Sequence, residues 1–383
     1  MLNTLRKDLE KYLDDLWELN TYLYHHPELA YEEHLASKAH TDLLKKHGFQ
    51  IQHAPLELET AYVARFKGDK PGRSIGYLAE YDALPGIGHG CAHNLLGTTS
   101  LGAALLLKDY VKEYGGEVIL YGTPGEEAGG AKVAFADNGL FDEVDVALCA
   151  HPSDGYYAPG RSMELVPLTF TFQGRTSHAA SDPHKGINAL DALLLTFNNI
   201  NALREHLLPE ARVHGIVKEG GLAANVVPER AVGEFYVRSM SAEYIGEVVE
   251  KVINCAKAGA LATGCELVYE KGVIYRSMRN NTVLAERFRS ILKEQGKQTL
   301  PPRESFGSLD MGNVSQVVPA IHPYFPITPD PIPAHSVEFR DASLTDYARE
   351  GMITTIVTLV KTAIDLNEEE GFYRAVVEEF QKK

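Results

Sequence analysis

The sequence has few cysteines, no long apolar run and no excess of basic residues, and each shortage excludes a class of protein. Four cysteines among 383 residues are too few for a disulfide-built scaffold. No apolar run approaches the about 18 residues that a membrane-spanning helix needs. Lys and Arg total 37 against 52 Asp and Glu, a formal net charge of −15. Binding to nucleic acid or to a membrane surface is therefore not expected.

Two common metal-binding motifs are also missing. The sequence contains neither HExxH nor a CxxC pair, which argues against a helix-borne zinc peptidase and against a zinc ribbon. The first 20 residues carry charges among leucines at helical spacing. This pattern predicts an amphipathic surface helix rather than a signal peptide. We therefore expect a cytoplasmic protein.

The chain is organised around residues 77–94. The apolar run Ser74 to Ala79 is typical of a buried strand in a mostly parallel sheet. A Gly-rich turn then presents Cys91 and His93 before a helix expected from about Leu95 to Tyr114. Open α/β sheets bind their ligands at this end of their strands. The two side chains could bind one ion, or they could be a buried thiol beside a solvent-facing histidine.

Two more apolar runs also end in polar residues. Val118 to Tyr121 leads into a Gly/Pro turn with Glu126 and Glu127, and Val144 to Ala150 ends at His151. Adjacent carboxylates on a loop point in different directions, so one can bind a metal while the other acts as general base. A solvated acidic turn, or a helix start at which Glu suits the dipole, is the alternative.

Three further segments are expected to contain turns or loops. A hairpin-like segment is expected at Tyr62 to Lys67, with residues 68–72 as its turn. A Gly/Ser-rich turn is expected at residues 305–315. His335 lies in a Pro-rich loop, and such loops carry function more often than packing.

The pattern changes from about Met163, which indicates an inserted domain. Glu164 to Gln173 alternates apolar and polar residues, the mark of a strand with one solvated face. The following helices and strands run in the order βαββαβ, which predicts a small α+β, ferredoxin-like unit. We expect an inserted domain at residues 164–278. Residues 1–163 and 279–383 would form one discontinuous α/β domain around a mostly parallel sheet.

Five candidate metal ligands come from separate loops, namely Cys91, His93, Glu127, His151 and His335. Such a mixture of sulfur, nitrogen and oxygen donors suits one or two divalent ions such as Zn²⁺ or Mn²⁺. Two ions about 3.5–4 Å apart with a shared ligand are typical of two-metal hydrolases. Glu126 would remain as the uncoordinated carboxylate.

Several short motifs along the chain, each weak alone, form a specific set together. They are His25-His-Pro-Glu28, the stretch from Glu80 to Gly97, Gly122-Thr-Pro-Gly-Glu-Glu127, His151-Pro152, Ser177-His-Ala-Ala180, Asn225-Val-Val-Pro228, Asp310-Met-Gly-Asn-Val-Ser315 and Ala334-His-Ser336. In this set, over essentially its whole length, the sequence resembles the M20 family of metallopeptidases and amidohydrolases. The similar branch contains N-acyl-amino-acid hydrolases, aminobenzoyl-glutamate hydrolase and dipeptidase-like members.

The resemblance implies a role for each candidate residue. The five candidate ligands would hold the metal, with Cys91 as a plausible bridge. A metal-activated water, with Glu126 as general base, would hydrolyse the amide bond of a small N-acyl amino acid or dipeptide. Asp82 would hydrogen-bond to one of the ligands and so orient it, although a cap at the strand end fits that residue equally.

The inserted domain resembles the lid and dimerisation domain of the family, which implies a homo-oligomer, either a dimer or a tetramer. His178 would reach across to polarise the scissile carbonyl, and Asn225 and Arg238 would hold the substrate carboxylate. The structural alternatives are a loop histidine with a local hydrogen bond for His178 and a strand residue on a solvated face for Arg238.

One residue departs from the family pattern, because Ala92 stands where Gly usually separates the Cys and His. If that position needs a positive φ, alanine adds strain of about 1 kcal/mol. The ligand loop would then be looser.

Two other functions remain open from the sequence. Cys91 could be the nucleophile of a cysteine hydrolase, which would make the activity sensitive to alkylation and indifferent to chelators. Alternatively, the chain could be a non-catalytic, metal-dependent binding protein for amino acid derivatives.

Overall fold

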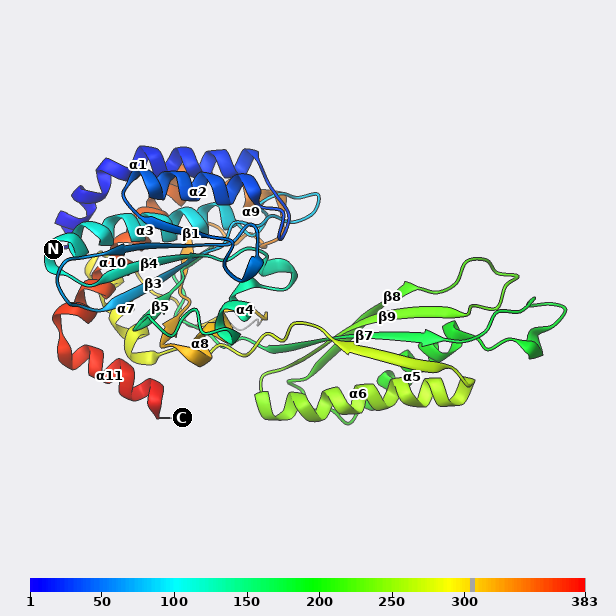
Figure 1. The fold of residues 1–383 in the computed structure, drawn as a ribbon. Coiled ribbons are helices and arrows are strands. Elements are labelled where there is room, and N and C mark those ends of the chain that lie inside the picture. The colour runs from blue at the N-terminus through cyan, green and yellow to red at the C-terminus, as the bar shows by residue number, and fades with distance from the viewer. Residues whose placement is uncertain (304–306, 383) are drawn as a thin grey trace. The chain divides into compact units, whose positions relative to one another are not determined.

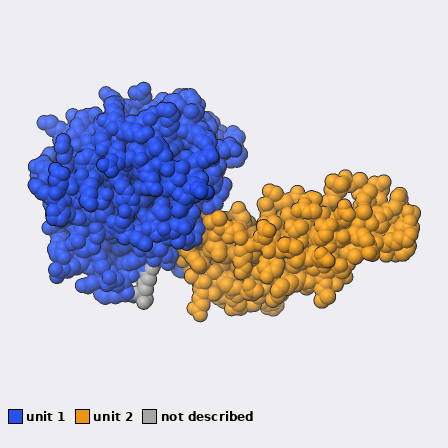
Figure 2. Space-filling model, in the orientation of Figure 1, with its two compact units in different colours: residues 1–161, 278–383 blue, residues 162–277 orange. Residues whose placement is uncertain are grey.

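The computed structural model describes residues 1–303 and 307–382. The chain forms two compact units, coloured separately in Figure 2. Unit 1 consists of Met1–Arg161 and Met278–Lys383, and unit 2 consists of Ser162–Ser277. No helix within the described ranges is both long and apolar enough to cross a membrane.

Unit 1 is built on a six-stranded sheet, most of which is parallel, as the sequence predicts (Figure 1). From one edge to the other its strands are β1 (Gln50–His53), β2 (Tyr62–Lys67), β4 (Glu117–Gly122), β3 (Ser74–Ala79), β5 (Val146–Leu148) and β11 (Ala320–Ile321). The strands β4, β3, β5 and β11 run parallel to one another, whereas β1 and β2 pair antiparallel.

Helices cover both faces of this sheet because its strands are apolar on both sides. In β3, Ile75 and Tyr77 face one core while Leu78 faces the other. The first core is shared with α1 (Leu2–His25), α3 (His93–Tyr114), α7 (Thr282–Glu294) and α10 (Asp346–Glu368). The second is shared with α4 (Ala131–Asp137) and α8 (Met311–Val317). Side chains that alternate between two dry faces are expected of a buried parallel strand.

Smaller elements complete unit 1. A two-stranded parallel sheet pairs β6 (His151–Ser153) with β12 (Tyr324–Pro326). The remaining helices are α2 (His34–Lys46), α9 (Val337–Ala342) and α11 (Glu370–Gln381). The carboxylate of Glu28 accepts hydrogen bonds from the first-turn amides of Leu35 and Ala36 at 3.0 and 2.9 Å. This acidic residue therefore caps α2.

Three sequence expectations need correction here. The hairpin expected after residues 62–67 is wrong, because β4 lies between β2 and β3 and pairs with both. Apolar strands of similar length give no sign of this spatial order. His151 does not end β5 but begins β6. Of the turn expected at 305–315, residues 305 and 306 lie outside the described ranges, and the helix α8 starts within it at Met311.

Unit 2 contains the predicted βαββαβ order. Its elements are β7 (Glu164–Gln173), α5 (Ala189–Arg204), β8 (Arg212–Glu219), β9 (Arg230–Ser239), α6 (Ala242–Thr263) and β10 (Glu266–Lys271). The strands form an antiparallel sheet in the order β10-β7-β9-β8, with α5 and α6 against one face (Figure 1). Phe170 and Phe172 face this helix layer and are fully buried.

Candidate functional site

The predicted ligands of the central stretch lie at the junction of a loop and the start of α3. Cys91 is the last loop residue but one, Ala92 precedes the helix with φ of 58°, and His93 is its first residue. The helix thus begins two residues earlier than expected. The left-handed turn at Ala92 directs the chain from the loop into the helix, with Cys91 and His93 on its two sides.

His93 is held in a fixed orientation by acidic neighbours. Its Nδ1 lies 2.9 Å from Oδ1 of Asp82, and its ring is fully buried. Its Nε2 makes no hydrogen bond to any described residue, although Oε2 of Glu80 is 3.2 Å away. Asp82 also accepts a hydrogen bond of 3.0 Å from the amide of Glu127 through its other oxygen. A carboxylate behind a histidine, with the far nitrogen left open, is the arrangement that orients metal-binding histidines.

Two groups of donor atoms share Cys91. The first contains Cys91, His93 and His151, and the second contains Cys91, Glu127 and His335. Within each group, one donor atom from every residue lies within 4.8 Å of the others. The five residues that the sequence singled out therefore converge in unit 1, with the thiol at the place common to both groups.

His151 and His335 present their ring nitrogens to this centre in different ways. The Nδ1–H of His151 donates to the carbonyl of Pro152 at 2.7 Å, so its Nε2 faces the Cys91 sulfur at 3.6 Å. The Nε2 of His335 lies 3.3 Å from Oε1 of Glu127. His335 has a φ of 63°, a left-handed conformation that is uncommon for residues other than glycine, although histidine adopts it more often than most.

Glu126 and Glu127 lie on one short turn, Glu126–Ala128, that follows β4. Glu127 belongs to the group around Cys91 and His335, whereas Glu126 is grouped with Glu80 and His93. The two adjacent carboxylates thus point to different neighbours, as expected for such a pair on a loop. Desolvation, followed by the charges of Glu80, Asp310 and Glu127, raises the pKa of Glu126 well above its usual value.

A buried ion-pair network lies beside this centre. The Nζ of Lys132 is 2.8 Å from Glu80 and 2.8 Å from Asp310, and all three side chains are at most 2% exposed. Burial alone would lower the pKa of Lys132, but the two carboxylates raise it. Glu80, Cys149 and His322 also approach one another closely. The Lys132 ammonium already neutralises Glu80 there, so we assign no ion to that group.

The donor set around Cys91 fits one or two divalent ions. The Nε2 of His93 and Oε1 of Glu127 are buried and have no hydrogen-bond partner within the described part of the chain, which is costly unless a ligand satisfies them. Burial lowers the pKa of His151 to about 3, so this imidazole is neutral and its lone pair is available at pH 7. Nitrogen, oxygen and sulfur donors in one cluster suit Zn²⁺ and similar ions.

The other three predicted residues belong to unit 2. His178 and Asn225 are exposed neighbours, because the Ala179 amide donates to the Asn225 carbonyl at 3.0 Å. The Nδ1 of His178 accepts from the amides of Ala180 and Ser181, both at 3.2 Å. This leaves the opposite ring nitrogen directed away from its own loop.

Arg238 is not close to that pair within unit 2. It lies on β9 opposite Leu165, at the beginning of β7, whereas His178 follows the end of β7 at Gln173. The eight residue steps from Leu165 to Gln173 span about 25 Å. The structure therefore brings His178 and Asn225 together and separates Arg238 from them.

Sequence reasoning missed several residues around the centre, namely Glu80, Lys132, Arg303, His322 and Tyr324. Two of them had a visible signal. Glu80, like Asp82, follows the apolar strand β3. Lys132 interrupts the apolar run of α4, which indicates a buried charge with a partner. The other three, Arg303, His322 and Tyr324, lie in segments that carry no distinctive sequence pattern.

The chain is similar to several known proteins. Residues 165–263 match the family model described as the M20 peptidase dimerisation domain. The Xaa-Arg dipeptidase of Mus musculus is 33% identical over 395 residues, which cover 98% of this chain and 91% of the mouse protein. A p-aminobenzoyl-glutamate hydrolase chain of Escherichia coli is 27% identical, with coverage of 99% of this chain and 94% of that protein.

Solved structures share the fold. A dinuclear metal-binding M20 peptidase from Bacillus subtilis superimposes with a TM-score of 0.67 at 21% identity, covering 91% of this chain and 99% of its own. An aminobenzoyl-glutamate utilization protein from Klebsiella pneumoniae gives a TM-score of 0.76 at 19% identity, with coverage of 94% and 98%.

Proposed function

Because the chain belongs to the M20 family of peptidases and amidohydrolases, we propose that it hydrolyses the amide bond of a small dipeptide or N-acyl amino acid in a metal-dependent reaction. The observation that carries this proposal is the pair of donor groups that share Cys91, with Glu126 beside them. A binding protein needs the ligands but has no need for a second acidic side chain on the same turn.

In this proposal, Cys91, His93, Glu127, His151 and His335 hold one or two divalent ions, Zn²⁺ or Mn²⁺. A bound ion would supply Lewis-acid polarisation and would lower the pKa of water. Glu126 accepts the proton of the attacking water and delivers it to the leaving nitrogen. A carboxylate whose pKa is raised well above its usual value suits both halves of this transfer. Asp82 keeps His93 in the required orientation.

The cysteine-nucleophile alternative is less well supported. Burial raises the pKa of the Cys91 thiol to about 12, and a thiol with such a pKa is a weak nucleophile at neutral pH. As a metal ligand, by contrast, Cys91 would be deprotonated by the cation.

The relatives suggest the class of substrate. One is named for dipeptides that end in arginine, and another for p-aminobenzoyl-glutamate. Both compounds are small amides that carry a free carboxylate on the amino acid side. We propose that this chain acts on a compound of the same kind.

Unit 2 contributes in this proposal by pairing with a second copy. His178 polarises the scissile carbonyl, and Asn225 and Arg238 bind the substrate carboxylate. If all three contact one small substrate, a single copy of unit 2 is insufficient, because about 25 Å separates Arg238 from the other two. The match of residues 165–263 to a dimerisation domain supports a homo-oligomer, either a dimer or a tetramer.

The decisive test is release of amine from dipeptides and N-acyl amino acids. Protein stripped of metal would be reloaded in parallel with Zn²⁺, Mn²⁺ or nothing. We expect release only after reloading. Release that persists without metal and stops after thiol alkylation would instead establish the cysteine alternative.

A single substitution tests the general base. Glu126→Gln keeps the size of the side chain but removes its basicity, so it should lower kcat by about 1,000-fold or more while metal content stays unchanged. The control is Glu113→Gln, an acidic residue near the far end of α3, which should behave as wild type. Activity of the Glu126 variant within tenfold of wild type would rule out this role.

A further inference from the structure

Arg303 lies over an aromatic surface in unit 1. Its guanidinium carbon is 5.3 Å from the ring centre of Tyr157 and 5.8 Å from that of Tyr324. One terminal nitrogen donates to the hydroxyl of Ser153 at 3.1 Å. We call these four residues, Ser153, Tyr157, Arg303 and Tyr324, the Arg303 cluster.

The backbone holds this cluster beside the candidate metal centre. Tyr324 is the direct ladder partner of His151 in the β6–β12 sheet, and their rings are 5.8 Å apart. Leu300 is tied to the segment after β6, because its amide donates to Tyr156 at 2.7 Å and its carbonyl accepts from Ala158 at 3.0 Å. Leu300, only three residues before Arg303, is therefore fixed by backbone hydrogen bonds. The ring of Tyr324 separates Arg303 from the predicted ligand His151.

The guanidinium has unused capacity for hydrogen bonding. Among the residues that the structure describes, no carboxylate forms an ion pair with Arg303, and the Ser153 hydroxyl is its one hydrogen-bond partner. Several other arginines of unit 1 that lie over aromatic rings do have such partners. Arg73 lies over Tyr373 and pairs with Glu370, and Arg287 lies over Phe372 and pairs with Glu369. Arg279, which lies over Phe380, has no carboxylate ion pair among the described residues either, but it donates to the backbone carbonyl of Phe380. Arg303 has only a hydroxyl partner among those residues.

We propose that Arg303 is the anchor in unit 1 for a second carboxylate of the substrate, beside the one that we assign to Asn225 and Arg238, and so determines specificity for amides with two carboxylates. This rests on the proposed function, because it places the carboxylate beside the centre at which the amide is cut. A guanidinium offers a planar pair of donors that matches a carboxylate. The rings of Tyr157 and Tyr324 hold that plane in place and shield it from water, which strengthens the interaction.

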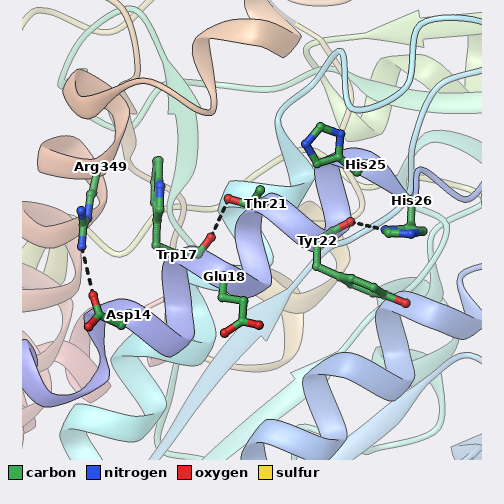
Figure 3. A pocket seen from close by; sticks show the side chains of 8 residues that line it. All are labelled: Asp14, Trp17, Glu18, Thr21, Tyr22, His25, His26 and Arg349. Atoms are coloured by element: carbon green, nitrogen blue, oxygen red, sulfur yellow. Dashed lines mark hydrogen bonds and ion pairs between the residues drawn. The ribbon is translucent and has the colours of Figure 1, made fainter.

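The hollow drawn in Figure 3 provides a matched control. There Arg349 lies 5.5 Å from the ring centre of Trp17 and 3.7 Å from an oxygen of Asp14. This arginine also stacks on an aromatic ring, but its carboxylate partner is internal. Arg349→Ala should therefore lose the same kind of stacking without any effect on the recognition of a substrate.

The test measures binding separately from hydrolysis. The probes are p-aminobenzoyl-glutamate, its α-carboxamide and its γ-carboxamide, together with the dipeptide Ala-Arg and its C-terminal amide. Calorimetry would give the dissociation constant of each probe for wild type, Arg303→Ala, Arg303→Lys and Arg349→Ala. Titrations on metal-free protein avoid turnover, and kcat and KM would be measured on reloaded protein.

We expect Arg303→Ala to weaken binding of p-aminobenzoyl-glutamate by about 100-fold, the size typical of a charge-paired contact, and to change binding of Ala-Arg, which has one carboxylate, by less than about threefold. Binding of the matching amide should change less than about threefold. The loss should fall on KM rather than kcat, because an anchor binds ground state and transition state alike. Arg303→Lys should recover part of the loss, and Arg349→Ala should match wild type. Wild type should bind one of the two glutamate amides as weakly as Arg303→Ala binds the free acid. That amide lacks the carboxylate that Arg303 holds, and so identifies it as the α- or the γ-carboxylate.

Two results would overturn the assignment. One is equal binding of acid and amide by the wild-type protein, and the other is an equal loss for both probes in Arg303→Ala. Neither result depends on turnover. Failure of the proposed function would appear separately, as the absence of metal-dependent amine release. Loss of binding in Arg238→Ala with no change in Arg303→Ala would place the anchor in unit 2 instead.

Discussion

At the scale of the residue, Ala92 shows how a strained position can be tolerated. Its φ of 58° is the left-handed conformation in which alanine is less stable than glycine by roughly 1–2 kcal/mol. Its methyl group, however, is fully buried in the core of unit 1. Burial of one methyl contributes about 0.8 kcal/mol, and glycine would add flexibility to the unfolded chain. The strain favours glycine, whereas methyl burial and the greater flexibility of glycine in the unfolded chain favour alanine. These contributions to the free energy of unfolding nearly cancel.

We therefore expect Ala92→Gly to change the free energy of unfolding by less than about 1 kcal/mol. Denaturant titration of metal-free protein would measure it. Ala54→Gly is the matched control, because Ala54 also has a positive φ, of 48°, but is only partly buried. That variant should be slightly more stable than wild type. A gain above about 2 kcal/mol in Ala92→Gly would mean that the buried methyl does not offset the strain.

At the scale of the element, Glu33 connects the start of α2 to the turn that carries Glu126. One carboxylate oxygen accepts from the Gly125 amide at 2.8 Å and the other from the Thr60 hydroxyl at 2.9 Å. Desolvation raises the pKa of this fully buried group from 4.5 to about 7. The folded state therefore holds the proton more tightly than the unfolded chain does.

This shift predicts a pH dependence of stability with a definite sign. Between pH 4.5 and about 7 the unfolded chain has released the proton of Glu33 while the folded protein keeps it. The free energy of unfolding should consequently fall as pH rises through this window, by up to about 3 kcal/mol. Glu33→Gln removes the titration, so urea titrations at pH 5 and pH 8 should show a smaller fall in the variant. Equal falls in both proteins would show that Glu33 does not titrate in this range.

The elements also show which parts of the fold the sequence could predict. The runs 74–79 and 164–173 have clear apolar periodicity, and the structure has strands at the same residues. The spatial order that places β4 between β2 and β3 depends on long-range pairing that no local pattern encodes. The sequence predicts a turn in place of helix α8 because Gly312 and Asn313 dominate its start, and burial of Met311 and Val314 against α4 overrides that propensity.

At the scale of the molecule, the convergence of the candidate ligands was largely predictable, because most of them follow apolar runs whose carboxyl ends lie at one edge of the sheet. Cys91, Glu127 and His151 each come after an apolar run, and such ends meet in a parallel sheet. Arg303 was not predictable, because its place beside His151 depends on the pairing of Leu300 with the chain after β6. Lys132 became interpretable only when Glu80 and Asp310, far apart in sequence, were seen around it.

The assembly of the whole molecule gives the last prediction, which concerns the edge of the sheet in unit 2. β8 is an edge strand, and Ile216 and Val217 on it are 58% and 44% exposed. The nearby Leu222 is 98% exposed. An uncovered apolar edge strand favours pairing with another chain, whereas lysine on the edge opposes it. Both edge strands carry charged residues at their ends, and Val268 on β10 is 61% exposed, but β10 has six residues and β8 has eight, so β8 offers the longer edge.

We expect light scattering to show a dimer or larger species for wild type and a monomer for the double variant Ile216→Lys, Val217→Lys at micromolar concentration. Val268→Lys on β10, where Val268 is 61% exposed, is the control and should keep the wild-type mass. The monomeric variant should also release amine far more slowly, because His178 and Arg238 of one copy lie at opposite ends of β7 and cannot both reach one substrate. If the β8 variant keeps the wild-type mass, or if Val268→Lys alone dissociates the protein, β8 is not the interface. If the monomer keeps full activity, His178 and Arg238 do not act on the same substrate.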